Sequence, residues 1–299
     1  HITYRNCHRK GGTLKHISSA LFPAAQTVSQ MPPEIPPQIC TIYSLLLFGA
    51  LMCSIIILRR PGHEWPLVVA ANRDEMLDRP WDAPDRHWPD RPEVIAGRDR
   101  LAGGSWFGRN DYGVFAAILN REGSLGPSLD KRSRGELVLE ALDYPDAAQA
   151  AEALADLNAN AYRSFNLVVG DNTDVLHVAN RACADRIAVE KVPSGLSMLT
   201  SREINDCRNA RIKMYLPQFE LADVPNPDSG DWMAWRQILS DKNCDPTIDP
   251  SSAMCIVSNW GFGTVSSTLL ALPAPGADNP LGIYMFAPGR PDQSDYVPV

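Results

Sequence analysis

The chain has 299 residues, of which 44% are hydrophobic, so it is long enough to bury one large core or two smaller ones. Its formal net charge is −7, and no block of like charge interrupts the sequence. This excludes the basic footprint of a nucleic-acid-binding protein, and we expect no nucleic-acid partner.

Seven cysteines occur at irregular spacings, without a C-x-x-C pair or a His/Cys cluster of zinc-ligand spacing. An odd number in a chain of this length argues against a disulfide framework, so we expect a reducing, cytoplasmic compartment. His177 lies in an apolar strand pattern, VLHVA, and is expected to be structural. We predict no metal site and no cofactor.

The N-terminal region allows two interpretations. Its first 39 residues mix basic residues, prolines and serines without periodicity, which is typical of disorder or of non-native sequence. Cys40–Leu58 then carries no charge over about the length that crosses a bilayer, and taken literally it is a signal anchor. Alternatively, residues 1–51 are an upstream leader or a non-native extension, and the domain covers residues 52–299.

The second interpretation is favoured by the residues that follow. Ser54–Leu58 (SIIIL) is rich in β-branched residues, and a second run, Pro66–Ala71 (PLVVAA), follows a Pro-Gly turn. Two such runs around a turn predict a β-hairpin. We therefore expect no stable membrane span in the mature protein.

Further along, strand-like and helix-like segments alternate. Residues 76–100 are dense in proline, aspartate, arginine and tryptophan, which predicts an ordered surface loop whose tryptophans cover apolar surface or line a cleft. Gly103 to Asn120 predicts strand, turn and strand. Lys131–Leu157 predicts two helices, the first preceded by a capping box of Ser133 and Glu136.

The remaining pattern completes an α+β protein. A second antiparallel series is expected at residues 165–170, 173–180 and 195–200, and helices from 205 and at 231–239. Three more strands are expected at 254–259, 261–273 and 282–289. Strands, two helical layers and strands again predict a layered sandwich.

Cys53 is the residue with the most distinctive chemistry. If translation starts at Met52 and that methionine is removed, Cys53 carries a thiol and a free amine on one carbon. The usual thiol pKa of about 8.5 leaves little thiolate at neutral pH, whereas an α-amine with a pKa of about 7.7–8.0 can accept the proton. One residue can therefore supply both nucleophile and base.

Arg73, Asp74 and Asn120 are the residue types that would complete such a site, as a cation, a partner for the amine and an oxyanion donor. Each ends an apolar strand pattern, and the predicted hairpin brings Cys53 to Arg73 and Asp74. The alternatives are a buried core cysteine, a surface ion pair and a turn asparagine.

Six motifs in order resemble the NRDE family, also called the transport and Golgi organisation protein 2 family. They are Met52-Cys53, Asn72-Arg73-Asp74-Glu75, Gly103-Gly104-Ser105-Trp106-Phe107-Gly108, Ser133-Arg134-Gly135-Glu136-Leu137, Phe165-Asn166-Leu167 and Gly263-Thr264-Val265-Ser266-Ser267-Thr268. The resemblance implies an N-terminal nucleophile hydrolase type of fold, a four-layer αββα sandwich. It also implies distant kinship with bile salt hydrolases and penicillin V acylases, which cleave linear amides with an N-terminal cysteine.

On that kinship Cys53 is the nucleophile, Asp74 the partner of its amine and Asn120 an oxyanion donor. This chain departs from these patterns at three positions. The acylases carry an arginine where this chain has Ala71, and a later asparagine near the position of Ser201. NRDE relatives often carry an arginine where this chain has Val265. From the family motifs we also expect binding residues, namely Asn72, Trp106, Asn166 and Ser201.

Two functions are consistent with these residues. The first is a cysteine N-terminal nucleophile hydrolase that cleaves a linear amide C–N bond in a small-molecule substrate. The second, implied by the roles of eukaryotic relatives in Golgi organisation, lipid homeostasis and haem trafficking, is a non-catalytic protein of the same fold that binds a haem or lipid ligand.

Overall fold

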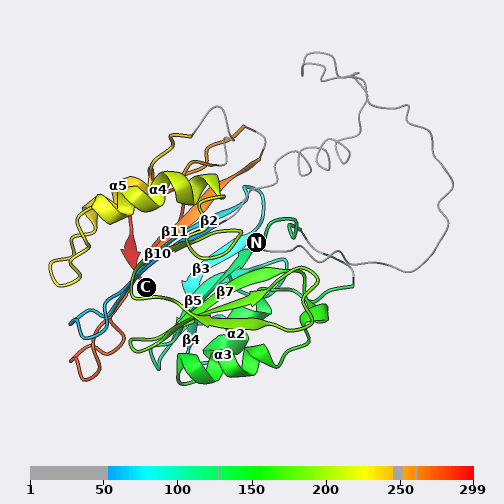
Figure 1. Cartoon of the computed structure of the whole chain (residues 1–299). Helices are drawn as coiled ribbons and strands as arrows, with labels where there is room; N and C mark the ends of the chain where they lie inside the picture. The colour runs from blue at the N-terminus through cyan, green and yellow to red at the C-terminus, as the bar shows by residue number, and fades with distance from the viewer. Residues whose placement is uncertain (1–52, 127, 129, 245–251, 260) are drawn as a thin grey trace, which may run out of the picture. The chain divides into compact units, whose positions relative to one another are not determined.

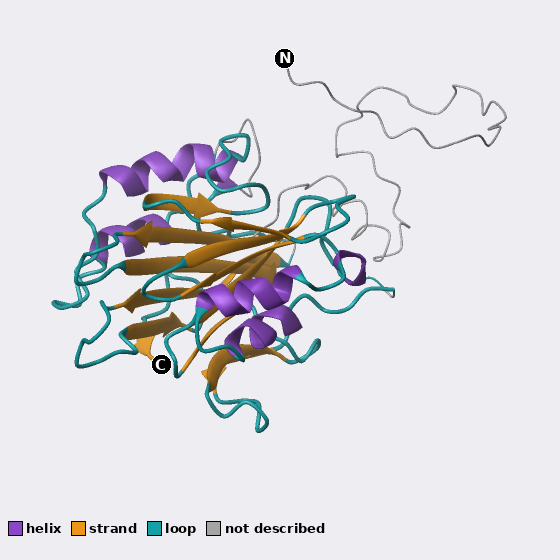
Figure 2. Ribbon diagram, turned by 60° about the horizontal axis from the view of Figure 1, so that its bottom comes forward, coloured by secondary structure: helices purple, strands orange, loops and turns teal. Residues whose placement is uncertain are grey.

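The computed structural model describes residues 53–126, 128, 130–244, 252–259 and 261–299. Two antiparallel β-sheets lie face to face, and helices cover the outer face of each sheet, which gives four layers (Figures 1 and 2). The predicted leader at residues 1–51 lies outside the described residues. Within them, no helix is both long and apolar enough to cross a bilayer.

The first sheet contains the N-terminal hairpin, and its strand order in the described part of the chain is β10-β1-β2-β11-β12-β13. The strands are β1 (Ser54–Arg59), β2 (Leu67–Met76), β10 (Gly195–Leu199), β11 (Phe262–Leu272), β12 (Ile283–Ala287) and β13 (Val297–Pro298). Strand β1 is buried along its whole length because it has a neighbour on each side and is covered on both faces.

The predicted hairpin is confirmed. Strand β1 pairs with β2 in antiparallel register, with Ser54 opposite Asn72. Successive side chains of a strand point to opposite faces, so Ile56 packs against the helices and Ile55 packs between the sheets. The last five residues of the uncharged Cys40–Leu58 run, from Ser54 onward, therefore belong to a sheet strand.

The second sheet has the strand order β3-β4-β5-β6-β7-β8-β9 in the described residues. Its strands are β3 (Trp81–Asp85), β4 (Val94–Asp99), β5 (Phe107–Asn110), β6 (Phe115–Asn120), β7 (Phe165–Gly170), β8 (Val175–Asn180) and β9 (Ala188–Lys191). The strand, turn and strand expected up to Asn120 are confirmed as β5 and β6.

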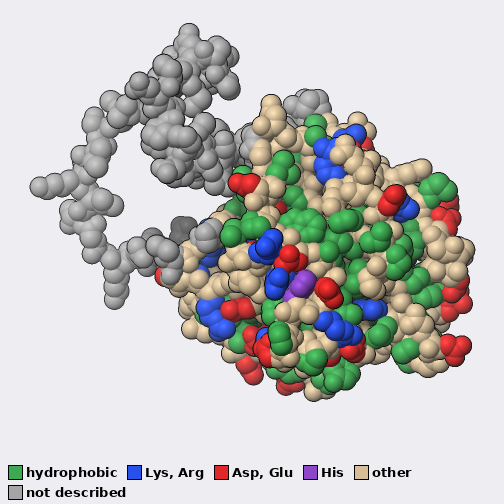
Figure 3. All heavy atoms as spheres, turned by 180° about the vertical axis from the view of Figure 1, so that it is seen from behind, with side chains coloured by type: hydrophobic (Ala, Val, Ile, Leu, Met, Phe, Trp, Pro, Cys, Tyr) green, Lys and Arg blue, Asp and Glu red, His purple; other side chains and the backbone are tan. Residues whose placement is uncertain are grey.

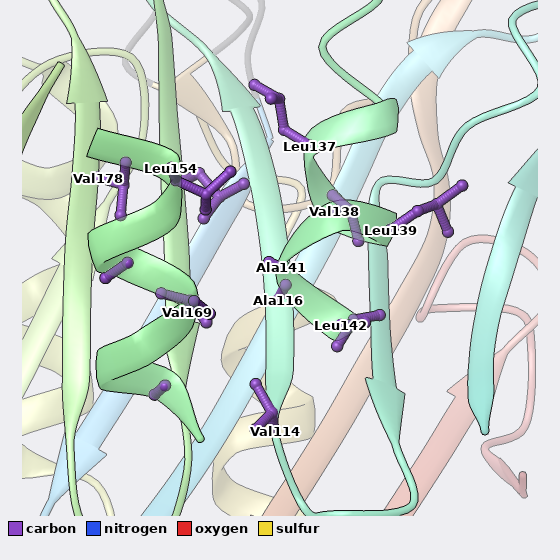
Figure 4. Close-up of a cluster of buried hydrophobic side chains, with 14 of the residues drawn as sticks. Val114, Ala116, Leu137, Val138, Leu139, Ala141, Leu142, Leu154, Val169 and Val178 are labelled. Atoms are coloured by element: carbon purple, nitrogen blue, oxygen red, sulfur yellow. The ribbon is translucent and has the colours of Figure 1, made fainter. Parts of the chain in front are cut away.

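Helices α2 (Glu136–Leu142) and α3 (Ala147–Ala155), followed by the short 3₁₀ helix η2 (Ala159–Ala161), cover the second sheet, and α4 (Ala210–Leu221) and α5 (Met233–Leu239) cover the first. Figure 4 shows Leu137, Val138 and Leu142 of α2 in one buried cluster with Ala116 of β6 and with Val114, which precedes β6. Burial of each of these leucines stabilises the fold by roughly 2 kcal/mol.

Several expectations about individual elements are wrong. Residues 76–100 are not a loop throughout, because they contain β3 and β4; β3 is an edge strand, where Pro84 is tolerated. Residues 254–259 form no strand, although all of MCIVSN was expected to be one. The strand expected at 195–200 is β10 (Gly195–Leu199), but it pairs with β1 in the first sheet and does not continue the second.

The predicted capping box is also wrong. Helix α2 begins after Gly135 without a side-chain cap, and the Ser133 hydroxyl accepts a bond from the Gly135 N–H. The Glu136 carboxylate turns away and accepts a hydrogen bond of 2.6 Å from the Tyr162 hydroxyl. Helix α3 is capped by Asp146, which accepts from the Gln149 N–H at 2.8 Å.

Asn110 joins the end of α2 to the β5–β6 turn, and it is fully buried. Its amide nitrogen donates to the carbonyls of Leu142 and Tyr144 at 2.9 and 2.8 Å. Its carbonyl oxygen accepts from the N–H groups of Tyr112 and Val114 at 3.1 and 2.9 Å.

We expect Asn110→Ala to lower the free energy of unfolding by about 3 kcal/mol, because it leaves buried backbone groups without partners. Urea denaturation measures this change. Asn279→Ala is the control, because Asn279 is exposed and donates one bond, to Gly282. A loss of stability at position 110 no larger than that of the control would contradict this role.

Candidate active site

The hairpin brings three of the predicted site residues together. Cys53 directly precedes β1, and the register that pairs Ser54 with Asn72 continues to place Cys53 beside Arg73. The Cys53 Sγ lies 3.7 Å from the main-chain carbonyl oxygen of Asp74 and donates to it. The side chains of Arg73 and Asp74 point to opposite faces of the sheet, so they act in different layers.

Arg73 points into the space between the sheets and is 5% exposed. Its guanidinium carbon lies 3.9 Å from the centre of the Trp106 ring, in cation–π geometry. Nη2 is 3.8 and 3.9 Å from carboxylate oxygens of Glu75 and Asp99. Nη1 is buried and has no hydrogen-bond partner among the described residues, so one donor of the cation is available to a ligand.

Trp106 is held in place by its neighbours. A Cβ on Gly97 of β4 would lie 2.3 Å from the Trp106 ring, so the indole packs directly onto backbone where only glycine leaves room. Trp81 meets Trp106 edge to face, with ring centres 5.9 Å apart. Trp81 therefore packs against the wall of the site. Of the two roles expected for it, covering apolar surface or lining a cleft, the structure shows packing.

Asp74 points into the helical layer, where its carboxylate is fully buried. One oxygen lies 2.7 Å from Arg211 Nη1 and the other accepts a bond of 2.6 Å from the Thr264 hydroxyl. The same Arg211 nitrogen donates to the Ser54 hydroxyl at 2.7 Å. Burial raises the pKa of Asp74, and Arg211 and Thr264 oppose that rise.

Arg211 was missed by the sequence analysis. It lies in the first turn of α4 and is 3% exposed. Tyr215 and Phe219 follow at steps of four residues, so Arg211 falls on the buried stripe of the helix. A lone arginine on an apolar stripe is the signal that could have identified a buried ion pair.

The Cys53 thiol is only partly buried, but its surroundings disfavour the thiolate. Burial, and after it the Asp74 carboxylate, raise the pKa of the thiol to about 11. The bond to the Asp74 carbonyl and the Arg73 cation act in the opposite direction. With its nitrogen in a peptide bond, Cys53 is therefore a neutral thiol at pH 7.

Cys53 and Arg73 share a narrow pocket between the two sheets, with an empty volume of about 320 Å³ that includes its open mouth. Apolar side chains from β1, β2, β5 and β6 form most of its wall. The lining residues are Cys53, Ser54, Ile55, Ala71, Asn72, Arg73, Trp106, Phe107, Ala117, Ile118, Leu119 and Thr268.

Asn120 lies in the second sheet, at the end of β6 and opposite Phe165 of β7. It follows Leu119, which lines the pocket, but Asn120 itself does not. No side-chain hydrogen bond joins Asn120 to another described residue. The structure therefore places it one residue beyond the pocket wall, with its amide uncommitted.

Asn72, expected to bind a ligand, uses its amide within the protein. Nδ2 donates to the carbonyls of Leu239 and Met254, both at 2.9 Å. Oδ1 accepts a bond of 2.6 Å from the Ser267 hydroxyl. These bonds tie β2 to β11 and the helical layer, and they occupy the amide that was expected to face a ligand.

The side-chain amide of Asn166 likewise forms hydrogen bonds to main-chain carbonyls. Its Nδ2 donates to the carbonyls of Thr200 and Arg202 at 2.9 and 2.8 Å. The residue between them, Ser201, accepts a bond of 3.3 Å from Asn209. Asn166 thus fixes the segment that follows β10, the strand that pairs with β1.

His177 is buried and its Nε2 lies 3.0 Å from Asn166 Oδ1. Because the Asn166 nitrogen is a donor, Oδ1 must accept, and we assign the proton to His177 Nε2. Glu190 and Glu203 lie near the ring, close enough to form a metal-ligand set on distance alone. Arg181 binds both carboxylates, at 2.8 and 2.7 Å, so the group is an ion-pair network beside a structural histidine.

Comparisons with known proteins agree with this architecture. Residues 52–276 match the family described as Transport and Golgi organisation 2. The human Transport and Golgi organization protein 2 homolog is 33% identical over 141 residues, which cover 44% of this chain and 50% of that protein. The Bos taurus homolog is 36% identical over 110 residues, which cover 35% of this chain and 38% of that protein. The chain thus spans half, or less, of the length of these relatives.

Among solved structures, the Caenorhabditis elegans N-acylethanolamine-hydrolyzing acid amidase ortholog superposes with a TM-score of 0.51 at 12% identity. The match covers 82% of this chain and 100% of that chain. At this identity the likeness concerns the fold.

The four-layer αββα sandwich is that of the N-terminal nucleophile hydrolases, as predicted. This chain belongs to the Transport and Golgi organisation 2 family, which confirms the resemblance of its six motifs.

The buried imidazole of His177 makes stability depend on pH. Burial lowers the pKa of His177 from 6.5 to about 4. As the pH falls, the unfolded chain binds the proton first, so stability that is complete above pH 6.5 is lost between pH 6.5 and 4. We expect a loss of about 3 kcal/mol from this residue.

Urea denaturation at pH 7 and pH 4.5 tests this expectation. His177→Gln keeps a donor toward Asn166 and should remove most of this pH dependence, whereas His63→Gln, at an exposed position, should leave it unchanged. An equal pH dependence in the wild type and His177→Gln would contradict the assignment.

Proposed function

We propose that this protein is a cysteine N-terminal nucleophile hydrolase that cleaves a linear amide C–N bond. The observation that carries the proposal is one pocket that holds both the Cys53 thiol and a buried arginine with an unpaired donor, Arg73 Nη1. A nucleophile and a donor for negative charge are the two groups that acyl transfer requires.

The reaction proceeds in two stages. The Cys53 sulfur attacks the amide carbon and passes its proton to its own α-amine, which must be free. The C–N bond then breaks as the resulting ammonium returns the proton to the leaving nitrogen. Water next attacks the thioester, which releases a carboxylic acid and restores the thiol.

The free amine is needed because burial and the Asp74 carboxylate raise the pKa of the Cys53 thiol. A pKa of about 11 leaves Cys53 almost entirely protonated at neutral pH, so a base must accompany attack. Asp74 is the proposed partner of the amine. Its carboxylate and the hydroxyl of Ser54, the residue next to Cys53, share one Arg211 nitrogen, which brings the carboxylate to the start of β1.

Arg73 is the proposed donor to the oxyanion of the tetrahedral intermediate, through Nη1. Asn120 is proposed as a second donor, because its amide is uncommitted and it ends β6, a strand that lines the pocket. The amidase ortholog that shares the fold is named for hydrolysing N-acylethanolamine, which is an amide, and this supports the reaction class. The Trp106 ring packs against one face of the Arg73 guanidinium in cation–π geometry.

The intact mass of the protein recovered from its natural host tests the first requirement. We expect a chain that begins at Cys53, because only that chain has a free amine on the reacting residue. A protein that retains any residue before Cys53 would exclude this mechanism, since a peptide nitrogen cannot accept the proton.

The second test uses acetyl and butyryl p-nitroanilides and follows the release of p-nitroaniline. We expect Cys53→Ala to reduce release at least about 10³-fold, because the nucleophile is lost. Cys207→Ala, at an exposed cysteine, is the control and should keep full activity. Turnover retained by Cys53→Ala would sink the proposal, and saturable haem or lipid binding without turnover would favour the carrier function.

A further inference from the structure

We propose that a polar cavity at one end of the sandwich, between segments of the two sheets, binds a small monocarboxylate. One part of its wall follows β6 of the second sheet and includes Arg121 and Glu122. Another part follows β10 of the first sheet and includes Ser201 and Arg202. The site is separate from the pocket that Cys53 lines.

The cavity lies at the end of the first sheet that also carries Cys53. Strand β10 pairs with β1 in antiparallel register, and its last residue, Leu199, lies opposite Ile55. Cys53 precedes Ile55 by two residues and Ser201 follows Leu199 by two, so both lie toward the same end of the pair. Binding in the cavity nevertheless does not require Cys53 to be a nucleophile.

The cavity is large enough for a small molecule. It offers about 210 Å³ to water-sized molecules. A single water needs about 10–15 Å³. On the same measure the pocket at Cys53 offers about 20 Å³, room for a water or two. The polar cavity can therefore hold a ligand of several heavy atoms.

Contacts between the two segments fix the walls of the cavity relative to each other. The Glu122 N–H donates to the Ser201 carbonyl at 3.1 Å. Arg121 donates to the Glu203 carboxylate, and Arg202 forms an ion pair with Glu122. Each of these contacts joins the segment after β6 to the segment after β10, so the cavity exists before a ligand enters it.

Two of the carboxylates in the wall are fully occupied by arginines. Glu203 accepts from Arg181 and Arg121, and the hydrogen bonds from Arg181 are the main cause that lowers the pKa of Glu203 to about 2. Asp206 accepts from Nε and Nη2 of Arg208, at 2.8 and 2.6 Å. These acids have little capacity left for a cationic ligand.

Hydrogen-bond donors remain available on the same walls. The Arg202 side chain is 33% exposed and forms one ion pair among the described residues, although a guanidinium carries five N–H donors. The Ser201 hydroxyl accepts from Asn209 at 3.3 Å and donates to no described residue. The Ser164 hydroxyl forms no hydrogen bond within the described part of the chain. An acceptor with several lone pairs, such as a carboxylate, is the group that complements these donors.

The charge of the walls favours a ligand with a single negative charge. Three arginines and three carboxylates line the cavity, so their formal charges sum to zero. They are Arg121, Arg202, Arg208, Glu122, Glu203 and Asp206. Asn209, the N-cap of the twelve-residue helix α4, follows directly, and the helix N-terminus adds a partial positive charge. One carboxylate, whose two oxygens match a guanidinium, suits this balance better than a phosphate dianion.

The test is isothermal titration of the full chain at pH 7 with lactate, with lactamide as its uncharged analogue, and with phosphate. We expect lactate to bind saturably with a Kd of about 1 mM or lower. Lactamide should bind at least about tenfold more weakly, because it lacks the negative charge that pairs with Arg202. Phosphate should also bind more weakly than lactate.

Two substitutions in one ion pair should change lactate binding in opposite directions. Arg202→Gln removes the main donor and should weaken binding at least about tenfold. Glu122→Gln removes the carboxylate that competes for Arg202 and should strengthen binding several-fold. Both changes break a solvent-exposed pair that adds little to stability, so both variants should fold. Arg100→Gln, at an exposed arginine that does not line the cavity, is the matched control and should bind like the wild type.

The two variants separate a ligand site from a structural ion pair. If the pair only holds the two segments together, both variants should weaken lactate binding, and that result would overturn the inference. Absence of saturable lactate binding, or equal binding of lactamide, would overturn it as well. Tighter binding of phosphate than of lactate would overturn the assignment to a monocarboxylate.

Discussion

The buried ion pair between Asp74 and Arg211 is the interaction on which the geometry of the site depends. Its atoms are 2.7 Å apart, and the two side chains are 0% and 3% exposed. Removing one partner of such a pair leaves an uncompensated charge in the core, typically at about 3–5 kcal/mol. Through Ser54 and Thr264 the pair also joins β1 and β11 to α4, so a helix outside the sheet fixes the strand that begins at Cys53.

The local part of this arrangement could be predicted from the sequence. Two β-branched runs around a turn define the hairpin, and its antiparallel register then brings Cys53 to Arg73 and Asp74. The partner of Asp74 could not be predicted, because Arg211 is 137 residues away and only the packing of α4 brings it near. The carbonyls that accept from the Asn72 amide belong to residues still further away in sequence, Leu239 and Met254.

Two of the errors in the fold have identifiable physical causes. The N–H of Cys255 donates to the Asp241 carbonyl and that of Ile256 to the Thr264 hydroxyl, so residues 254–256 are buried without becoming a strand. In β3 the register shifts between Asp82 and Asp85, which hides the strand from pattern reading. The sequence contains no block of like charge, and on the face shown in Figure 3 basic and acidic side chains are interspersed.

The environment of Cys53 has a consequence for oxidative chemistry. Peroxides attack thiolates, and a thiol with a pKa of about 11 holds only about one part in ten thousand as thiolate at pH 7. While its nitrogen remains in a peptide bond, Cys53 is therefore protected from conversion to sulfenic acid although it is only partly buried. In the mechanism we propose, the same surroundings would keep the Cys53 sulfur reduced until its amine becomes free.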